Sequence, residues 1–216
     1  MSIRICTWNS QGNPANNFNK SEILVWLYRQ NDVLLIQECG DIIGQIAEIL
    51  DHPYCYYVPQ AGAFNNRCST CIITKQPADS GPDYFYLSSG SGRYAIHIFI
   101  FGVHIYTLHS LSGNGTSDVI DVLNKSNDPF IIGGDMNCTP EELKESYGRK
   151  KSRMIQTGTQ SRPMKTARFI RSNVCTHPSS RRELDYFLVN QYIHSCNTKC
   201  FHLHGGDHYA ICTTVY

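Results

Sequence analysis

Six short apolar runs in this chain end in polar residues of the kinds that bind metal ions or transfer protons. They are TWNSQG, LLIQECG, YTLHSLSGNG, IIGGDMNCTP, ELDYFLV and GGDHYAI, beginning at Thr7, Leu34, Tyr106, Ile131, Glu183 and Gly205. A single acid at a strand end is commonly solvated, and a Gly-Asp-x-Asn sequence commonly makes only an Asx turn. Six such ends in one chain are hard to explain one by one. Together they predict a metal-dependent phosphodiesterase.

Hard oxygen ligands at two of these ends predict a Mg²⁺ site, with Mn²⁺ or Ca²⁺ as alternatives. Glu38 closes the apolar run of Leu34 to Ile36, so its carboxylate should project at the sheet edge, and Asn9 ends the first run. Mg²⁺ binds through one or two carboxylates and keeps several waters for itself or for substrate phosphate. Glu38 is therefore the expected principal ligand, with Asn9 beside it.

Two histidines supply the proton transfers that phosphodiester cleavage needs. Such a reaction requires a metal to neutralise charge, a base for water and an acid for the leaving oxygen. His109 and His208 are expected to be the base and acid, and Asp185 to fix the tautomer of one of them. Asp135 and Asn137 stand two residues apart, hence on the same side of an extended segment, where they could hold water or a phosphate oxygen.

The elements that must position these residues follow from hydrophobic periodicity. Strands are predicted at Ile3–Trp8, Val33–Gln37, Tyr54–Val58, Cys71–Thr74, Tyr84–Leu87, Tyr94–Phe101, His104–His109, Pro129–Gly133, Leu184–Asn190 and Tyr209–Val215. Helices are predicted at Lys20–Gln30, Ile42–Leu50, Ser117–Asn124 and Glu141–Tyr147, the last with Thr139 as N-cap. A hairpin should join the strands on either side of the Phe101-Gly102 turn. This order predicts an α/β fold with two sheets packed face to face and helices outside.

Length and charge narrow the class of protein further. The 216 residues suit one domain spanning 1–216. No apolar run is long enough for a transmembrane helix, and MSIRICTWN does not predict a signal peptide. Residues 1–143 carry 7 Lys and Arg against 14 Asp and Glu, whereas residues 144–182 carry 11 against 1. The basic segment, which includes Arg149, Lys150, Lys151 and Arg153, is expected to bind a polyanion; a solvated loop is the alternative.

The ten cysteines leave the redox compartment open. In an exported protein an even number permits disulfides, and in a cytosolic one most would be small buried apolar residues. A structural zinc site could be built from Cys68 and Cys71 or from Cys196 and Cys200 with nearby histidines. The alternating strand CSTCIIT explains the first pair more simply, so no zinc site is predicted.

The ordered set TWN, QE, LHSL, GDMN, LDY and final DH resembles the endonuclease/exonuclease/phosphatase superfamily. Within it, TWNSQG, LHSLSGNGTSD, THPSSRRELDYFLV and GGDHYAI are most similar to the catalytic B subunits of cytolethal distending toxins, which are deoxyribonuclease I-like nucleases. The resemblance covers nearly the whole chain. It implies a four-layer α/β/β/α sandwich of two packed mixed β-sheets flanked by helices.

The resemblance also implies roles for individual residues. Glu38, Asn9 and Asp207 would bind the metal, His109 and His208 would act as general acid and base, and Asp185 would orient a histidine. Asp135 and Asn137 would position water and phosphate. Substrate phosphate contacts would come from Arg93, Asn137 and Asn114.

Two departures from the pattern affect what the resemblance implies. Deoxyribonuclease I-like enzymes carry a further Glu that supports the first histidine, but residues 61–67 offer no acid, and Asn65 or Asn66 would have to replace it. Abasic-site endonucleases usually show a tyrosine and Pro-Asn where this chain has LHSLSGNG, which argues against a repair role.

The leading functional hypothesis is a Mg²⁺-dependent endonuclease that nicks double-stranded DNA with little sequence preference. It would serve as the catalytic subunit of a bacterial genotoxin or as an effector, with toxin delivery subunits as partners. A secreted protein acting in the host nucleus is then expected, with a cytoplasmic location as the alternative. Two further hypotheses stand beside it: a phosphatase of the same fold acting on an anionic phosphoinositide lipid, and a non-catalytic binding or assembly subunit.

Overall fold

Two mixed six-stranded sheets form the centre of the molecule in a computed structural model. The structure describes residues 2–58, 69–89, 92–157, 166–203 and 206–216, without the side chains of residues 150–157. Sheet A contains β1 (Ile3–Asn9), β2 (Val33–Gln37), β3 (Tyr54–Val58), β4 (Thr70–Thr74), β11 (Ser195–Phe201) and β12 (Ala210–Val215), in the order β11-β12-β1-β2-β4-β3. Sheet B contains β5 (Ser80–Tyr86), β6 (Tyr94–Ile100), β7 (Val103–His109), β8 (Phe130–Asp135), β9 (Ala167–Ile170) and β10 (Asp185–Asn190), in the order β5-β6-β7-β8-β10-β9.

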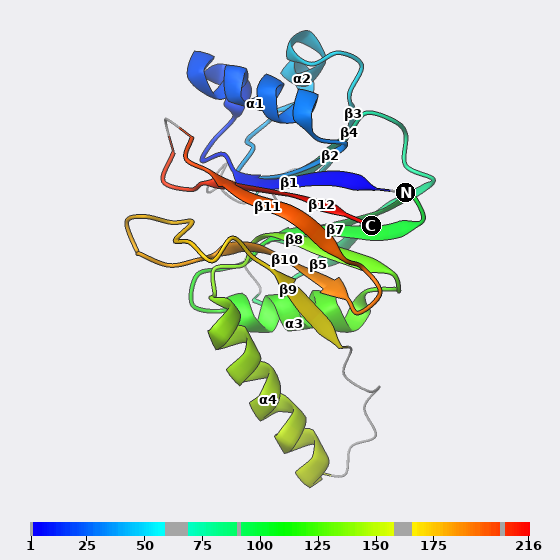
Figure 1. Cartoon of the computed structure of the whole chain (residues 1–216), viewed down its shortest axis with the longest axis vertical. Coiled ribbons are helices and arrows are strands. Elements are labelled where there is room, and N and C mark those ends of the chain that lie inside the picture. Colours follow the sequence, from blue (N-terminus) through cyan, green and yellow to red (C-terminus); the bar gives the residue numbers. More distant parts are fainter. Residues whose placement is uncertain (1, 59–68, 90–91, 158–165, 204–205) are drawn as a thin grey trace.

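Helices cover the outer face of each sheet (Figure 1). The short helix η1 (Pro14–Asn16), α1 (Phe18–Gln30) and α2 (Ile43–Ile49) lie on the side of sheet A, while α3 (Gly115–Lys125) and α4 (Pro140–Thr157) lie on the side of sheet B. The fold is therefore the α/β sandwich of two packed mixed sheets that the sequence predicts, and it is consistent with a deoxyribonuclease I-like architecture.

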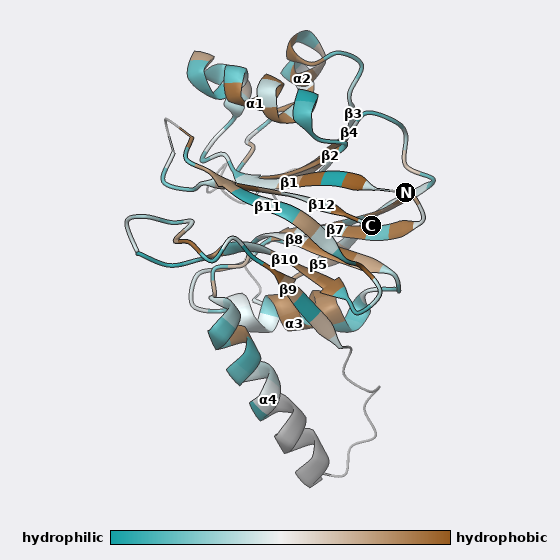
Figure 2. Cartoon of the chain, in the orientation of Figure 1, coloured by the Kyte–Doolittle hydropathy of each residue, from teal (hydrophilic) through white to brown (hydrophobic). Residues whose placement is uncertain are grey.

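Three apolar clusters hold these four layers together. One lies between the sheets and includes Ile5, Leu35 and Ile131. The second packs α1 and α2 on sheet A through residues such as Leu24 and Leu27, and the third packs α3 and α4 on sheet B. β2 is buried along its whole length, so both of its faces are apolar. Figure 2 shows the apolar residues along the strands and polar residues on the outer turns of the helices.

The first and last strands are neighbours in sheet A. β1 pairs antiparallel with β12, with Cys6 opposite Cys212, and these two cysteines form a disulfide. The other cysteines of the described ranges are free thiols. Cys196 and Cys200 belong to neither of the groups of close His, Cys, Asp and Glu side chains found there, and Cys68 lies outside the described residues.

Every strand and helix predicted from the sequence occurs, with shifts at the ends. The predicted hairpin is the antiparallel pair β6–β7. α4 begins as predicted, with the Thr139 hydroxyl accepting from the Glu142 N–H and the Glu142 carboxylate accepting from the Thr139 N–H. The predicted end at Tyr147 was wrong, because the helix continues through Gly148 and the basic residues to Thr157.

Two strands were missed. β9 has only four residues and lies in the basic segment, for which a solvated loop is the alternative prediction. β11 is an edge strand of polar residues such as Asn197 and Lys199, and its alternation is exposed against half-buried rather than polar against apolar. Neither strand therefore carries the pattern of a half-buried strand. Among the described residues, no helix is both long enough and apolar enough to cross a membrane.

Candidate active site

Strand register gathers the predicted site residues at one edge of both sheets. β1 and β2 are parallel, with Asn9 opposite Gln37, so Glu38 follows immediately at the same edge. In sheet B, β7 and β8 are parallel with His109 opposite Asp135, and the antiparallel β10 begins with Asp185 opposite Asp135. Since β12 starts at Ala210, His208 precedes it at this edge as well.

Buried polar contacts fix the two sheets relative to each other near this edge. The Gln37 side chain accepts from the Thr7 hydroxyl in sheet A and donates to the Thr107 hydroxyl in sheet B, at 3.2 and 3.0 Å. Closer to the edge, Asn9 Nδ2 donates to Asp135 Oδ2 at 3.0 Å and to Glu38 Oε1 at 3.3 Å. Because all these groups are largely buried, their partners determine one alignment of the sheets.

One carboxylate oxygen, Asp135 Oδ2, lies between the two predicted catalytic histidines. His109 Nε2 is 3.5 Å away and His208 Nε2 is 3.6 Å away. His109 Nε2 is also 3.8 Å from Glu38 Oε1. The other oxygen of Asp135 accepts from the Asn137 N–H at 3.0 Å, so the Asx turn typical of this sequence forms as well.

Asp185 holds the ring of His208. Its Oδ2 lies 2.8 Å from His208 Nδ1, and its side chain is fully buried. Burial lowers the pKa of His208, but the carboxylates of Asp185, Asp135 and Asp207 outweigh burial and raise it from 6.5 to about 9. His208 is therefore an imidazolium at neutral pH, with Nδ1 facing Asp185 and Nε2 facing Asp135.

Three of the eight described non-glycine residues with a positive φ angle lie at the same edge. Gln11, Glu38 and Asn137 adopt positive φ angles of 50°, 54° and 48°. Residues other than glycine rarely adopt this conformation, and it costs roughly 1 kcal/mol or more at each position. Asn137 is held by a hydrogen bond from its Nδ2 to the Ser110 carbonyl oxygen at 2.8 Å. Such strain persists where the surrounding structure over-determines a functional geometry.

Asp207 lies at the rim of the site and shows how a cation would fit. Its N–H donates to Gln11 Oε1 at 2.8 Å, while its Oδ1 is buried, has no hydrogen-bond partner among the described residues and lies 3.8 Å from His208 Nε2. Two groups in the described ranges bring three potential ligand atoms within 4.8 Å of one another: His177, Asp207 and His208, and Asp135, Asp185 and His208. Together with Glu38, these carboxylates offer the hard oxygen atoms that suit a divalent cation.

Sequence analysis does not identify three residues that lie at this edge. Gln11 supports Asp207, and Lys20 donates from Nζ to the carbonyl oxygens of Ser10 and Gln11. Burial lowers the pKa of Lys20, and Glu38 and Asp207 partly offset that effect. His177 lies 3.4 Å from Asp207. Gln11 and His177 stand within TWNSQG and THPSSRRELDYFLV, but only a three-dimensional arrangement reveals their contacts.

The remaining predicted residues have different surroundings. Arg93 Nη1 donates to the carbonyl oxygens of His109 and Ser110, so its guanidinium holds the end of β7. Asn114 is exposed at the N-cap of α3 and makes no side-chain capping hydrogen bond. Arg149 pairs with Glu145 on the surface of α4. The side chains of Lys150, Lys151 and Arg153, like Asn65 and Asn66, lie outside the described residues.

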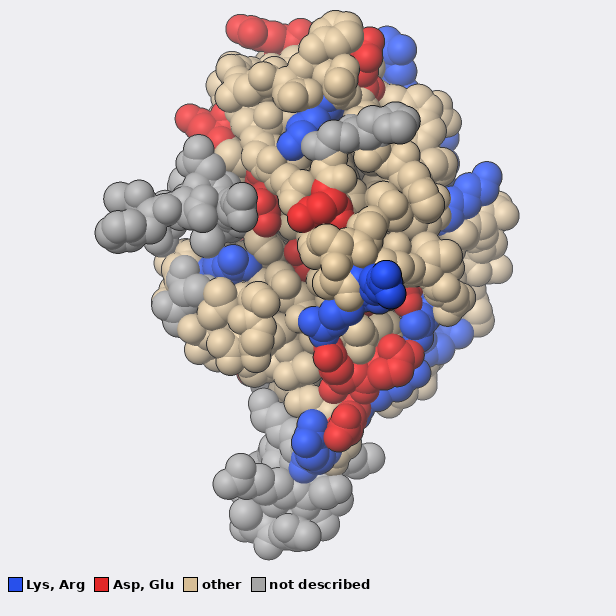
Figure 3. Space-filling view, turned by 90° about the vertical axis from the view of Figure 1, so that its left-hand side faces the viewer, with Lys and Arg blue, Asp and Glu red and all other residues tan. Residues whose placement is uncertain are grey.

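Charge is unevenly distributed over the face that carries this edge. Figure 3 shows acidic side chains near the middle of the face, with basic side chains at separate places above and below them.

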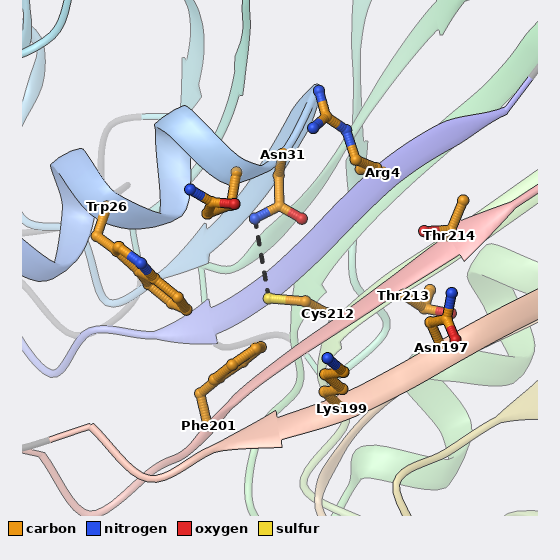
Figure 4. Close-up of a pocket in the computed structure, with 10 residues that line it drawn as sticks. Arg4, Trp26, Asn31, Asn197, Lys199, Phe201, Cys212, Thr213 and Thr214 are labelled. Carbon is orange, nitrogen blue, oxygen red and sulfur yellow. Dashed lines mark hydrogen bonds between the residues drawn. The ribbon is translucent and has the colours of Figure 1, made fainter.

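A hollow lies away from this edge, between α1 and the strands β11 and β12, with a volume of about 320 Å³. Figure 4 shows Trp26, Phe201 and Lys199 around it and the hydrogen bond from Asn31 to Cys212. None of the predicted site residues whose side chains are described lines this hollow.

The fold and this site together define a class of protein. Its members are deoxyribonuclease I-like sandwiches with acids, amides and histidines at one sheet edge. The sequence model of the endonuclease/exonuclease/phosphatase family matches residues 6–208. The chain belongs to that family, and its membership supports nuclease or phosphodiesterase activity. Comparison with curated protein sequences finds no significant match.

Solved structures of this fold include cytolethal distending toxins and an AP endonuclease. The cytolethal distending toxin of Actinobacillus actinomycetemcomitans aligns over 98% of this chain and 97% of that one, with 16% identity and a TM-score of 0.66. CdtB, the biologically active subunit of such a toxin, aligns over 98% and 96%, with 17% identity and a TM-score of 0.69. An AP endonuclease from Archaeoglobus fulgidus aligns over 98% of both chains, with 15% identity and a TM-score of 0.64. At these identities the likeness shows a shared fold.

Proposed function

We propose that this protein is a Mg²⁺-dependent endonuclease that nicks double-stranded DNA with little sequence preference. The observation that carries the proposal is the position of Asp135 Oδ2, 3.5 Å from His109 Nε2 and 3.6 Å from His208 Nε2. Two proton-transfer groups thus face one carboxylate beside Glu38, which is the arrangement that hydrolysis of a phosphodiester needs. A scaffold or assembly subunit has no need of such a cluster.

The residues that would hold the cation are Glu38 and Asp207, with Asn9 beside them. When bound, a divalent cation neutralises the phosphate charge and lowers the pKa of a water ligand. Asn9 keeps the Glu38 and Asp135 carboxylates in place through its Nδ2, and Gln11 fixes the main chain of Asp207.

The two histidines would perform the proton transfers. Asp185 accepts from His208 Nδ1–H, so the reactive atom of His208 is Nε2, directed at Asp135. His208 Nε2 and His109 Nε2 would serve as the pair that removes a proton from water and gives one to the leaving oxygen. Asp135 and Asn137 would orient the phosphate and the attacking water between them.

Phosphate recognition is proposed for Arg93 and Asn114, and DNA backbone binding for Arg149, Lys150, Lys151 and Arg153. Basic side chains neutralise the phosphates of either strand without reading the sequence. The fold shared with cytolethal distending toxin supports a genotoxin or effector role, in which the chain would be delivered by partner subunits and act in the nucleus of a host cell.

The experiment that tests the activity is relaxation of supercoiled plasmid by purified protein with Mg²⁺. Metal-dependent nicking is expected from the wild type, and EDTA should abolish it. His208→Ala and His109→Ala should each lower the rate by about 10² to 10⁴-fold, since each removes a general acid or base. His194→Ala is the matched control, because this histidine is exposed and directly precedes β11, whose first residue Ser195 pairs with Val215 at the end of β12 that is remote from His208.

Full activity of both site variants would contradict the assignment of the histidines. A folded wild-type protein that does not nick DNA would contradict the DNA substrate. In that case release of phosphate from phosphoinositide vesicles would identify the phosphatase of the same fold.

A further inference from the structure

His177 is held at the rim of the candidate site by its neighbour Thr176. The buried Thr176 hydroxyl accepts from the N–H groups of Leu184 and Asp185 at 2.9 and 3.0 Å. The Thr176 carbonyl oxygen accepts from the Tyr209 N–H at 2.9 Å. Because Tyr209 follows His208, Thr176 ties the loop that carries His177 to both members of the Asp185–His208 pair.

The side chain of His177 faces the same two residues that face the cation site. Its Nε2 lies 3.4 Å from Asp207 Oδ2. Its ring lies edge-on to the His208 ring, with centroids 4.5 Å apart and an angle of 67° between the planes. With Asp207 and His208, it has the spacing of three ligands to one metal ion. Spacing alone would make His177 a candidate ligand.

Hydrogen bonding at the other ring nitrogen contradicts that role. The Ser180 N–H donates to His177 Nδ1 at 3.2 Å, and the Ser180 hydroxyl lies 2.7 Å from the same atom. A backbone N–H can only donate, so Nδ1 must be the acceptor and the proton of the neutral ring is on Nε2. The nitrogen that carries the proton, Nε2, lies 3.4 Å from Asp207 Oδ2 and at the same distance from the Ser179 hydroxyl, whereas a metal ligand must present a lone pair.

We infer that His177 is a positioning residue for Asp207 and does not itself bind the cation. Its Nε2–H occupies the side of Asp207 Oδ2, and Gln11 holds the Asp207 main chain. The buried Oδ1, which has no hydrogen-bond partner among the described residues, is then the oxygen left for the cation. This inference rests on the proposed function in one respect, namely that Asp207 is a cation ligand.

The experiment compares His177→Gln and His177→Phe with the wild type in the full-length chain. Glutamine can place an N–H donor near the position of Nε2, whereas phenylalanine keeps only the ring that packs on His208. Mn²⁺ binding, followed by electron paramagnetic resonance, is the readout. His177→Phe should weaken Mn²⁺ binding by about tenfold, the usual effect of removing a group that orients a metal ligand. His177→Gln should stay within about threefold of the wild type.

Two spectroscopic measurements separate the donor role from the ligand role. Long-range ¹H–¹⁵N correlation in the metal-free protein should show the Nε2–H tautomer of His177. Nitrogen hyperfine coupling to bound Mn²⁺ should be the same in the wild type and in His177→Gln. An Nδ1–H tautomer, a nitrogen coupling lost with His177, or equal Mn²⁺ affinity of all three proteins would overturn the inference.

These outcomes are independent of the DNA substrate. If the wild type fails to nick plasmid while His177→Gln and His177→Phe still differ in Mn²⁺ affinity, the proposed substrate is contradicted and the role of His177 is supported. If the wild type nicks plasmid but His177→Phe binds Mn²⁺ as tightly as the wild type, the role of His177 is contradicted and the proposed activity is supported.

Discussion

Glu38 shows how a single side chain can be placed by two constraints at once. Its backbone is in the left-handed region, and its Oε1 accepts from Asn9 and lies near His109. The strained turn directs the carboxylate over the end of β2, where the two sheets meet. A residue in such a position is expected to be sensitive to a change of charge without a change of size.

Replacing Glu38 by Gln should therefore raise the Mg²⁺ concentration needed for half-maximal plasmid nicking by about tenfold or more, because an amide is a weaker ligand than a carboxylate. Mg²⁺ titration of the nicking rate checks this expectation. Glu48→Gln is the matched control, since Glu48 is an exposed acid of α2. An unchanged Mg²⁺ response in Glu38→Gln would place the cation elsewhere.

The His208 imidazolium links stability to pH. The pKa of His208 is about 9 in the folded protein against 6.5 for an ordinary histidine, so the folded state binds the proton more tightly. The resulting stability is fully present below about pH 6.5 and is lost as the pH rises through about 9. The stabilisation from this proton is at most about 3 kcal/mol, because each unit between the folded and the ordinary pKa of His208 contributes about 1.4 kcal/mol.

Urea unfolding in EDTA checks this dependence. The wild type should exceed His208→Gln in unfolding free energy by the largest amount at pH 6, and the difference should shrink steadily up to pH 9.5. A difference that does not change with pH would mean that His208 is neutral in the folded, metal-free protein.

At the scale of elements, the close approach of β7 and β8 sets the position of Asp135. A Cβ at Gly134 would overlap the carbonyl oxygen of Leu108 on the neighbouring strand. Gly134 is thus required by the same pairing that puts His109 opposite Asp135.

Gly134→Ala should destabilise the protein by about 1–3 kcal/mol or more, the usual cost of overpacking, and should lower nicking as well, because Asp135 must move with β8. Gly148→Ala, in the exposed middle of α4 with open space around the glycine, should instead be neutral or stabilise by up to about 1 kcal/mol. Urea unfolding of the two variants makes the comparison. Equal stability of both would mean that β7 and β8 can separate at little cost.

The position of a candidate site residue could be predicted from sequence where that residue ends one apolar run. Glu38, His109 and Asp135 each end a buried strand, so their common edge followed from the topology of parallel pairs. Prediction failed where position depends on contacts between distant segments. The support of Asp207 by Gln11 spans 196 residues, and β11 does not alternate polar with apolar residues, so neither leaves a periodic pattern in the sequence.

At the scale of the whole molecule, the candidate site is acidic, whereas one segment of the sequence is basic. Acids lie at the site and again lower on the same face, where basic side chains lie among them, while residues 144–182 carry an excess of Lys and Arg. A polyanionic substrate would be repelled at the acids without a cation and attracted by the basic segment. Affinity and cleavage should therefore depend on different residues.

Changing Lys150, Lys151 and Arg153 together to Gln should weaken DNA binding and reduce the slope of log affinity against log salt by about 2 to 3, close to one unit for each lost phosphate contact. Fluorescence anisotropy at several salt concentrations gives both quantities. A triple change of Arg29, Lys75 and Lys125, which are exposed elsewhere, removes the same charge and serves as the control. Equal slopes for the two triple variants would identify the basic segment as a solvated surface.

The pairing of β1 with β12 has a consequence for how the protein is made on the ribosome. β1 is synthesised about 200 residues before its partner β12, and Asp207 and His208 immediately precede β12. A growing chain can fold other parts first, but it cannot complete sheet A or bring both histidines together until β12 has been synthesised. The candidate site is thus complete only in molecules that contain β12, and translation products that end before it should lack the activity proposed here.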